Sequence, residues 1–99
     1  MANSPKYDFG QLHPEYQAVL KNWKTGDEFT SHHFIDALKR AFRSEYEGVL
    51  DAYGRDEPTA HAQIAKSLRR VREVKLLRDR TSSRNLQGEK GKAALWKKC

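Results

Sequence analysis

Apolar residues recur at intervals of three and four positions through most of this chain, and this spacing is lost in the last third. The segments 12–23, 32–43, 44–53 and 60–72 each follow the interval, which predicts four amphipathic helices. The expected inner faces are Leu12, Tyr16, Val19, Leu20 and Trp23; Phe34, Ile35, Leu38, Ala41 and Phe42; Tyr46, Val49, Leu50 and Tyr53; and Ala60, Ile64, Ala65, Leu68 and Val71. The first half of the chain is therefore expected to supply most of a helical core.

Short polar residues predict where three of these helices begin. Thr30 or Ser31 is placed to cap the second helix, because a hydroxyl can accept from a free backbone N–H. Ser44 and Glu47 match the capping-box spacing for the third helix. Thr59 is the expected cap of the fourth helix, after a loop over residues 55–58.

The last third has the pattern of a hairpin. Residues 74–80 and 93–97 have the length of strands, and the segment between them is rich in glycine, serine and asparagine. Residues 27–30 form a brief extended piece, and Trp96 is expected to pack the hairpin against the helices. Residues 1–11 are expected to be an N-terminal arm, in part disordered, with Tyr7 and Phe9 able to pin it to the core. The predicted fold is α+β: one domain over residues 12–99, with about four helices followed by a C-terminal β-hairpin.

Charge divides the chain into two parts. The 99 residues carry a formal charge of +6. Residues 1–59 hold 7 Lys/Arg and 10 Asp/Glu, a balance of −3, whereas residues 60–99 hold 12 Lys/Arg and 3 Asp/Glu, a balance of +9. A strongly basic half on a small domain predicts a polyanionic partner such as nucleic acid.

Composition also argues against several classes. The longest apolar stretches are three or four residues, so we expect no membrane span, and no apolar segment follows the first residues as a secretory signal requires. The single Cys99 cannot form an internal disulfide, which suits a reducing compartment. We expect a cytoplasmic or nucleoid-associated location.

No set of residues predicts catalysis, a cofactor or a metal. Paired carboxylates, a Ser/His/Asp set and a phosphate-cradling glycine loop do not stand out. Adjacent residues His32 and His33 would point about 100° apart on a helix, so one ion could not easily take both. His13, His61 and Cys99 lack ligand spacing. We expect a protein that is not an enzyme.

The order of elements resembles the winged helix-turn-helix class. The resemblance is carried by the entry at residues 29–31 into the helix over 32–43, by the helix over 59–71, and by the hairpin from Val74 to Trp96. The helix over 44–53 departs from that pattern, because it stands between the two helices that normally form the helix-turn-helix. The resemblance implies binding of double-stranded DNA by a monomer or homodimer acting as a small transcriptional, phage or plasmid regulator.

The basic residues are placed where this function would need them. A recognition helix packs one face on the core and presents long polar side chains to the major groove, and a wing needs a cationic tip. In the helix over 60–72, Gln63 is a candidate reader of adenine, and arginines could read guanine or hold phosphate. The helix start could bind a phosphate through its free N–H groups. The candidate DNA-binding residues are Thr59, His61, Gln63, Lys66, Arg69 and Arg70 near the helix, Arg78 and Arg80 on one strand face, and Arg84, Lys90 and Lys92 in the wing over 81–92.

Other interpretations of the basic half remain open. It could dock on an acidic or nucleic-acid-handling protein as a binding module or inhibitor, since fold alone does not decide function. It could bind RNA, although an exposed aromatic sheet is not evident. The basic face of the helix could also be a solvated surface.

Overall fold

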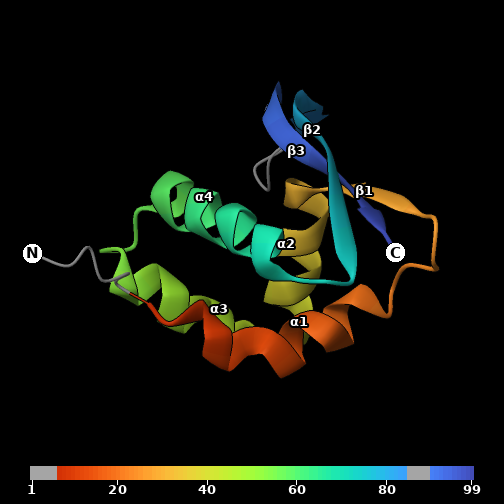
Figure 1. Ribbon diagram of the computed structural model, residues 1–99. Coiled ribbons are helices and arrows are strands. Elements are labelled where there is room, and N and C mark those ends of the chain that lie inside the picture. Colours follow the sequence, from red (N-terminus) through yellow and green to blue (C-terminus); the bar gives the residue numbers. More distant parts are fainter. Residues whose placement is uncertain (1–6, 85–89) are drawn as a thin grey trace, which may run out of the picture.

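A computed structural model describes residues 7–84 and 90–99, which form four α-helices and a small antiparallel sheet (Figure 1). The elements in chain order are η1 (Phe9–Leu12), α1 (His13–Leu20), β1 (Glu28–Thr30), α2 (Ser31–Ala41), α3 (Arg43–Ala52), α4 (Glu57–Ser67), η2 (Leu68–Arg70), β2 (Val74–Arg84) and β3 (Lys90–Lys98), where η denotes a 3-10 helix. The α+β class predicted from the sequence is confirmed.

The sheet has the strand order β1-β3-β2, so the hairpin gains a third strand from the front of the chain. β1 pairs with the end of β3, with Phe29 opposite Trp96. Gly26 continues this pairing just outside β1, since its N–H donates to the Lys98 carbonyl at 2.8 Å. Its φ of +97° favours glycine at this turn. The brief extended piece predicted at residues 27–30 is therefore an edge strand of the sheet.

Trp96 joins the sheet to the helices. Its side chain is 1% exposed, and its Nε1–H donates to the buried Ser31 Oγ at 2.9 Å. α2 lies at the centre of the molecule and packs against α1, α3, α4, β1 and β3. The core is formed by Leu12, Tyr16, Val19, Leu20, Phe29, Phe34, Ile35, Leu38, Tyr46, Val49, Leu50, Ala60, Ile64, Leu68, Val71, Val74 and Trp96. Most of the predicted inner faces are thus confirmed, but Ala41 is exposed, and Trp23, Phe42, Tyr53 and Ala65 are only partly buried.

The first helix is displaced toward the N-terminus. It begins as the 3-10 turn η1 at Phe9, and its α-helical part ends at Leu20 instead of Trp23. Trp23 lies in the following turn and stacks on Phe29 with ring centroids 4.4 Å apart. The ammonium of Lys98 donates to the Leu20 and Trp23 carbonyls at 2.8 and 2.7 Å, which satisfies the helix end from across the fold. Tyr7 and Phe9 pack against the core, as predicted.

Of the three helix caps predicted from the sequence, one is confirmed and two are wrong. Thr30 caps α2, where it accepts from the His33 N–H at 3.3 Å in a capping box. The capping box predicted at Ser44 is absent, because a bend at the single residue Phe42 lets α3 begin at Arg43 and puts Ser44 inside the first turn.

Thr59 does not cap the fourth helix. Asp56 is the N-cap residue, and Pro58 fits the first turn because its missing N–H needs no partner there. The α-helix ends at Ser67, so Arg69 and Arg70 lie in the 3-10 turn η2. The predicted helix over 60–72 is therefore shifted by about one turn and tightened at its end.

The arms of the hairpin are longer than predicted. β2 extends to Arg84, and β3 begins at Lys90. Residues 81–84 and 90–92 therefore belong to paired strands instead of the predicted loop, and residues 85–89 lie outside the described ranges. Two register shifts interrupt the β2–β3 ladder, one between Leu76 and Arg78 and one between Arg78 and Thr81.

Candidate nucleic-acid interface

The fourth helix has the two faces that the sequence predicts. Ala60, Ile64 and Leu68 are buried, and an exposed stripe runs along the opposite side. This stripe consists of Thr59, Ala62, Lys66, Arg69 and Arg70, with Gln63 half-buried beside it. The exposed cations lie at the C-terminal end of α4 and in η2.

The start of α4 carries the opposite charge. Asp56 occupies the N-cap position, where its side chain forms no capping hydrogen bond, and Glu57 lies in the first turn. The Thr59 hydroxyl donates to Asp56 Oδ2 at 2.8 Å. These carboxylates oppose phosphate binding at the helix start, which the sequence had favoured, and they leave the other end of α4 as the cationic one.

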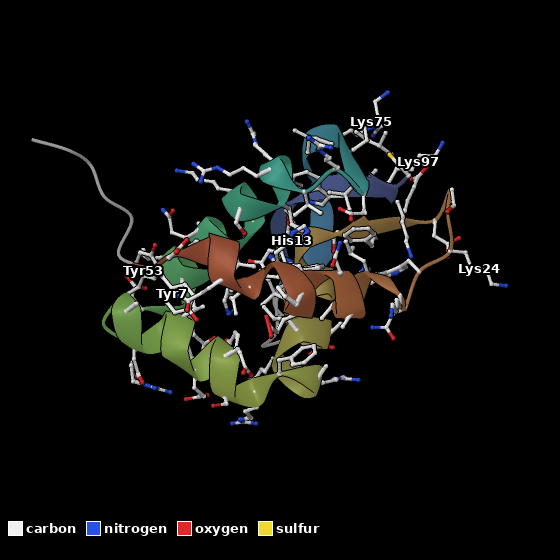
Figure 2. The ribbon with its side chains drawn as sticks, turned by 60° about the horizontal axis from the view of Figure 1, so that its bottom comes forward. Tyr7, His13, Lys24, Tyr53, Lys75 and Lys97 are labelled. Carbon is white, nitrogen blue, oxygen red and sulfur yellow. The ribbon has the colours of Figure 1, made fainter. Side chains whose placement is uncertain are left out.

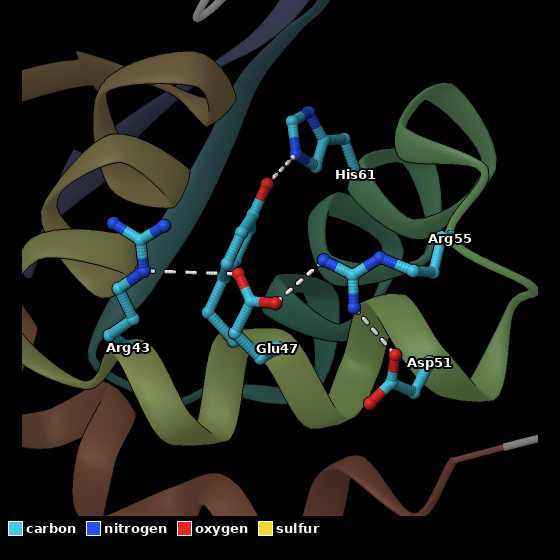
Figure 3. Close-up of polar contacts among 6 residues, drawn as sticks. Arg43, Glu47, Asp51, Arg55 and His61 are labelled. Carbon is cyan, nitrogen blue, oxygen red and sulfur yellow. Dashed lines mark hydrogen bonds and ion pairs between the residues drawn. The ribbon is translucent and has the colours of Figure 1, made fainter.

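His61 lies between two helices. Its ring is half-buried, and its Nε2 is 2.7 Å from the Tyr46 hydroxyl of α3 (Figure 3). Burial lowers the pKa of His61 below its ordinary value of 6.5, and burial raises the pKa of Tyr46 to about 12. The ammonium of Lys39 lies 5.5 Å from the centroid of the Tyr46 ring. The position of His61 is thus that of a link between α3 and α4.

Further exposed cations follow η2 directly into the sheet. Arg72 and Lys75 are exposed, and Lys97 of β3 is the register partner of Lys75. Figure 2 shows Lys75 and Lys97 close to each other at one end of the molecule. Sequence reasoning did not include these three among the candidate residues: their charge was visible, but the strand register that places Lys75 beside Lys97 was not.

We call the combined set the cationic surface: Lys66, Arg69, Arg70, Arg72, Lys75, Arg78 and Lys97. Arg69 has an interaction partner in the structure. The other six form no ion pair with any side chain that the structure describes, namely those of residues 7–78 and 93–99.

The remaining candidates lie toward the hairpin end. Arg84 pairs in register with Lys90, and Lys92 with Ser82, so their backbones belong to the ladder. Their side chains, like that of Arg80, are outside the described part of the chain. The prediction that Arg78 and Arg80 share a strand face assumed regular alternation, which the second register shift interrupts.

Charges on α2 and α3 are arranged differently, in ion pairs. Arg55 donates to Glu47 Oε1 and to Asp51 Oδ1, both at 2.6 Å, and Arg43 lies 3.8 Å from Glu47 (Figure 3). These two hydrogen bonds raise the pKa of Arg55. We call the set Asp36, Arg40, Arg43, Glu47, Asp51 and Arg55 the paired surface; its remaining pair joins Arg40 to Asp36 at 3.1 Å.

A small hollow between α1 and the end of β3 is a weaker candidate. It is lined in part by Pro14, Gln17, Lys21, Glu73 and Lys98. Its polar groups already serve the fold: Gln17 donates to Glu73 Oε2 at 2.9 Å, and Lys98 holds the end of α1. This hydrogen bond is the main reason that the pKa of Glu73 is lowered.

The residues that the structure describes, 7–84 and 90–99, contain no cluster of three or more His, Cys, Asp or Glu side chains placed to hold a metal ion. Within the same ranges, no helix has the length and apolar character to cross a membrane.

Comparisons with protein-family models, with curated proteins and with solved structures give no significant match to this chain.

Proposed function

We propose that this protein binds double-stranded DNA through the cationic surface. The observation that carries the proposal is the contrast in charge pairing. Six exposed cations at the end of α4 and on the sheet have no ion-pair partner among the described side chains of residues 7–78 and 93–99, while Arg40, Arg43 and Arg55 are paired with carboxylates. Unpaired Lys and Arg side chains on one region are available to neutralise phosphates and to release their counterions.

The contacts of α4 are assigned to its C-terminal half. Lys66 and Arg70 are one turn apart on the exposed stripe, so both can reach the same stretch of DNA backbone. Gln63 lies on the same side and is the candidate for contact with a base edge. Thr59 and His61 leave the contact set, because one bonds to a carboxylate and the other to Tyr46.

The order of elements adds support for a winged-helix mode of binding. A helix, a short strand, further helices and a C-terminal hairpin follow one another, with α3 as an addition between α2 and α4. We place the end of the hairpin, around residues 81–92, against the DNA backbone or minor groove. A small regulator of transcription is the role we assign to such a protein.

The salt dependence of binding tests the proposal. We expect a short labelled duplex to bind with a slope of about −4 to −6 in a plot of log affinity against log salt, since each phosphate contact contributes about −0.9. Absence of duplex binding at about 50 mM salt would contradict the proposal. Binding to poly-glutamate but not to the duplex would favour the alternative, an acidic protein partner.

Selection from a random duplex pool tests the regulatory role. Enrichment of one sequence motif is the result expected of a regulator, because base-edge contacts distinguish sequences. Recovery without enrichment would leave binding to the backbone alone and would contradict site-specific regulation.

A further inference from the structure

We infer that the outer face of the sheet is a second phosphate-binding surface, formed by Lys75, Arg78 and Lys97, which holds the DNA backbone beside the stretch contacted by α4. This inference rests on the proposed function and deepens it, because it assigns three residues of the cationic surface a phosphate contact of their own, separate from the contact made at the end of α4.

The first observation is a like-charge pair across two strands. Lys75 of β2 and Lys97 of β3 are direct partners in the antiparallel ladder, and both side chains are exposed. Side chains in such positions have Cβ atoms about 4.5–5.5 Å apart, so two ammonium groups there repel each other. An anion placed between them would remove this repulsion.

The second observation is that a β-bulge turns Arg78 toward solvent. Val74 is buried and Leu76 is packed against the core, so regular alternation would send Arg78 to the core face as well. The ladder shifts between Leu76 and Arg78, leaving Leu77 as an extra residue, and Arg78 pairs with Leu95 and is exposed. Bulges commonly redirect a side chain in this way.

The charge balance of this face favours an anionic partner. Glu28 of β1 is the register partner of Lys97 on its other side, but no ion pair joins them. Among the side chains described, those of residues 7–78 and 93–99, three cations and one carboxylate of this face therefore leave an excess of two positive charges.

Position favours DNA over other polyanions. Only residues 71–73 separate η2 from β2, and Arg72 lies within them, so the cations of α4 and of the sheet follow one another without interruption by a helix. Phosphates recur about every 3.4 Å along each DNA strand, so a duplex can meet both groups at once.

The test neutralises the face in the full-length chain. The variant Lys75→Gln/Arg78→Gln/Lys97→Gln is titrated with the same labelled duplex used for the unaltered protein. We expect the salt slope to lose about 2 to 3 in magnitude, and the affinity at about 0.1 M salt to fall on the order of a hundredfold. The loss should be similar for unrelated duplex sequences, because phosphates carry no sequence information.

A matched variant removes equal charge elsewhere. Lys21, Lys24 and Arg40 are exposed and lie outside the cationic surface, so Lys21→Gln/Lys24→Gln/Arg40→Gln should change the slope by less than about 1. Circular dichroism and thermal unfolding establish that both variants are folded.

The outcomes separate the two proposals. If the unaltered protein does not bind the duplex, the proposed function itself is wrong. If it binds and the sheet variant keeps its slope, only the inference about the sheet is overturned. The inference is also overturned if the sheet variant keeps duplex binding but loses binding to poly-glutamate.

Discussion

The paired surface on α2 and α3 and the cationic surface at the end of α4 use the same kinds of side chain in opposite ways. On the paired surface, each arginine has a carboxylate within 3.8 Å or less. On the cationic surface, the exposed lysines and arginines follow one another with few acidic residues between them. The two surfaces therefore differ in whether their charges are already neutralised by ion pairs within the fold.

Helical spacing explains much of the difference. Asp36 and Arg40 on α2, and Arg43 and Glu47 on α3, are four positions apart, where side chains on a helix meet. Arg55 lies in the turn after α3, and from there it reaches Glu47 and Asp51. The neighbours of Lys66 at four positions are Ala62 and Arg70. A partner for Lys66 must therefore come from outside its own helix.

The largest expected effect is on duplex affinity and tests the comparison directly. Lys66→Gln/Arg70→Gln removes two phosphate contacts and should weaken binding roughly 50-fold at about 0.1 M salt. Arg40→Gln/Arg43→Gln removes the same charge from the paired surface and should change affinity only a few-fold. Equal losses in the two variants, measured by fluorescence anisotropy, would show that net charge alone governs binding.

The next largest effect is on stability and concerns the hydrogen bond between Tyr46 of α3 and His61 of α4. Tyr46→Phe removes the hydroxyl that pairs with His61 Nε2 at 2.7 Å. Because a half-buried ring nitrogen then lacks its partner, the free energy of unfolding should fall by about 1–2 kcal/mol in urea denaturation. Tyr7→Phe is the control, and the duplex salt slope should be unchanged in both. A Tyr46→Phe protein as stable as the parent would mean that the bond does not hold α3 to α4.

Low pH should weaken the contact between His61 and Tyr46. The pKa of His61 is below 6.5 in the folded protein, so the unfolded chain takes up a proton that the folded chain does not. The stability contributed by the neutral ring is therefore present above about pH 6.5 and is lost as the pH falls through the lowered pKa. Urea denaturation at a series of pH values should show a smaller loss in His61→Gln than in the parent. The exposed His13, replaced in the same way, serves as control, and an unchanged pH dependence in His61→Gln would assign the acid sensitivity to other groups.

The smallest effects should have opposite signs in the two regions. Glu47→Gln removes one partner from Arg43 and one from Arg55, which keeps Asp51, and should lower the free energy of unfolding only slightly, since the pairs are exposed. Lys75→Gln should raise it by a few tenths of a kcal/mol, because it removes repulsion from Lys97. Both changes should shrink in high salt, and a loss of stability in Lys75→Gln would contradict the cross-strand repulsion.

Much of the helical fold could be predicted, because the signals are local. The interval between Phe34, Ile35 and Leu38 identifies a buried face within one helix, and all three are at most 1% exposed. Helix starts were less predictable, since the same hydroxyl chemistry that makes Thr30 a cap occurs at Ser44 and Thr59, where neighbouring turns moved the helix start upstream. For the candidate site, exposure could be predicted in part: Lys66 on α4 and Arg70 in η2 are exposed as expected, but Lys75 and Lys97 are grouped only by strand register.

The sequence by itself determined the periodic core faces, the α+β class and the split between an acidic and a basic half. Each of these depends only on composition or on the spacing of residues close together in the chain. Only the tertiary structure decided which distant residues lie side by side and which side chains face solvent. It brought Phe29 beside Trp96, placed His61 against Tyr46 and turned Arg78 outward at a bulge. The physical reason is that pairing between distant segments depends on the register and packing of the whole chain, which no local window of residues contains.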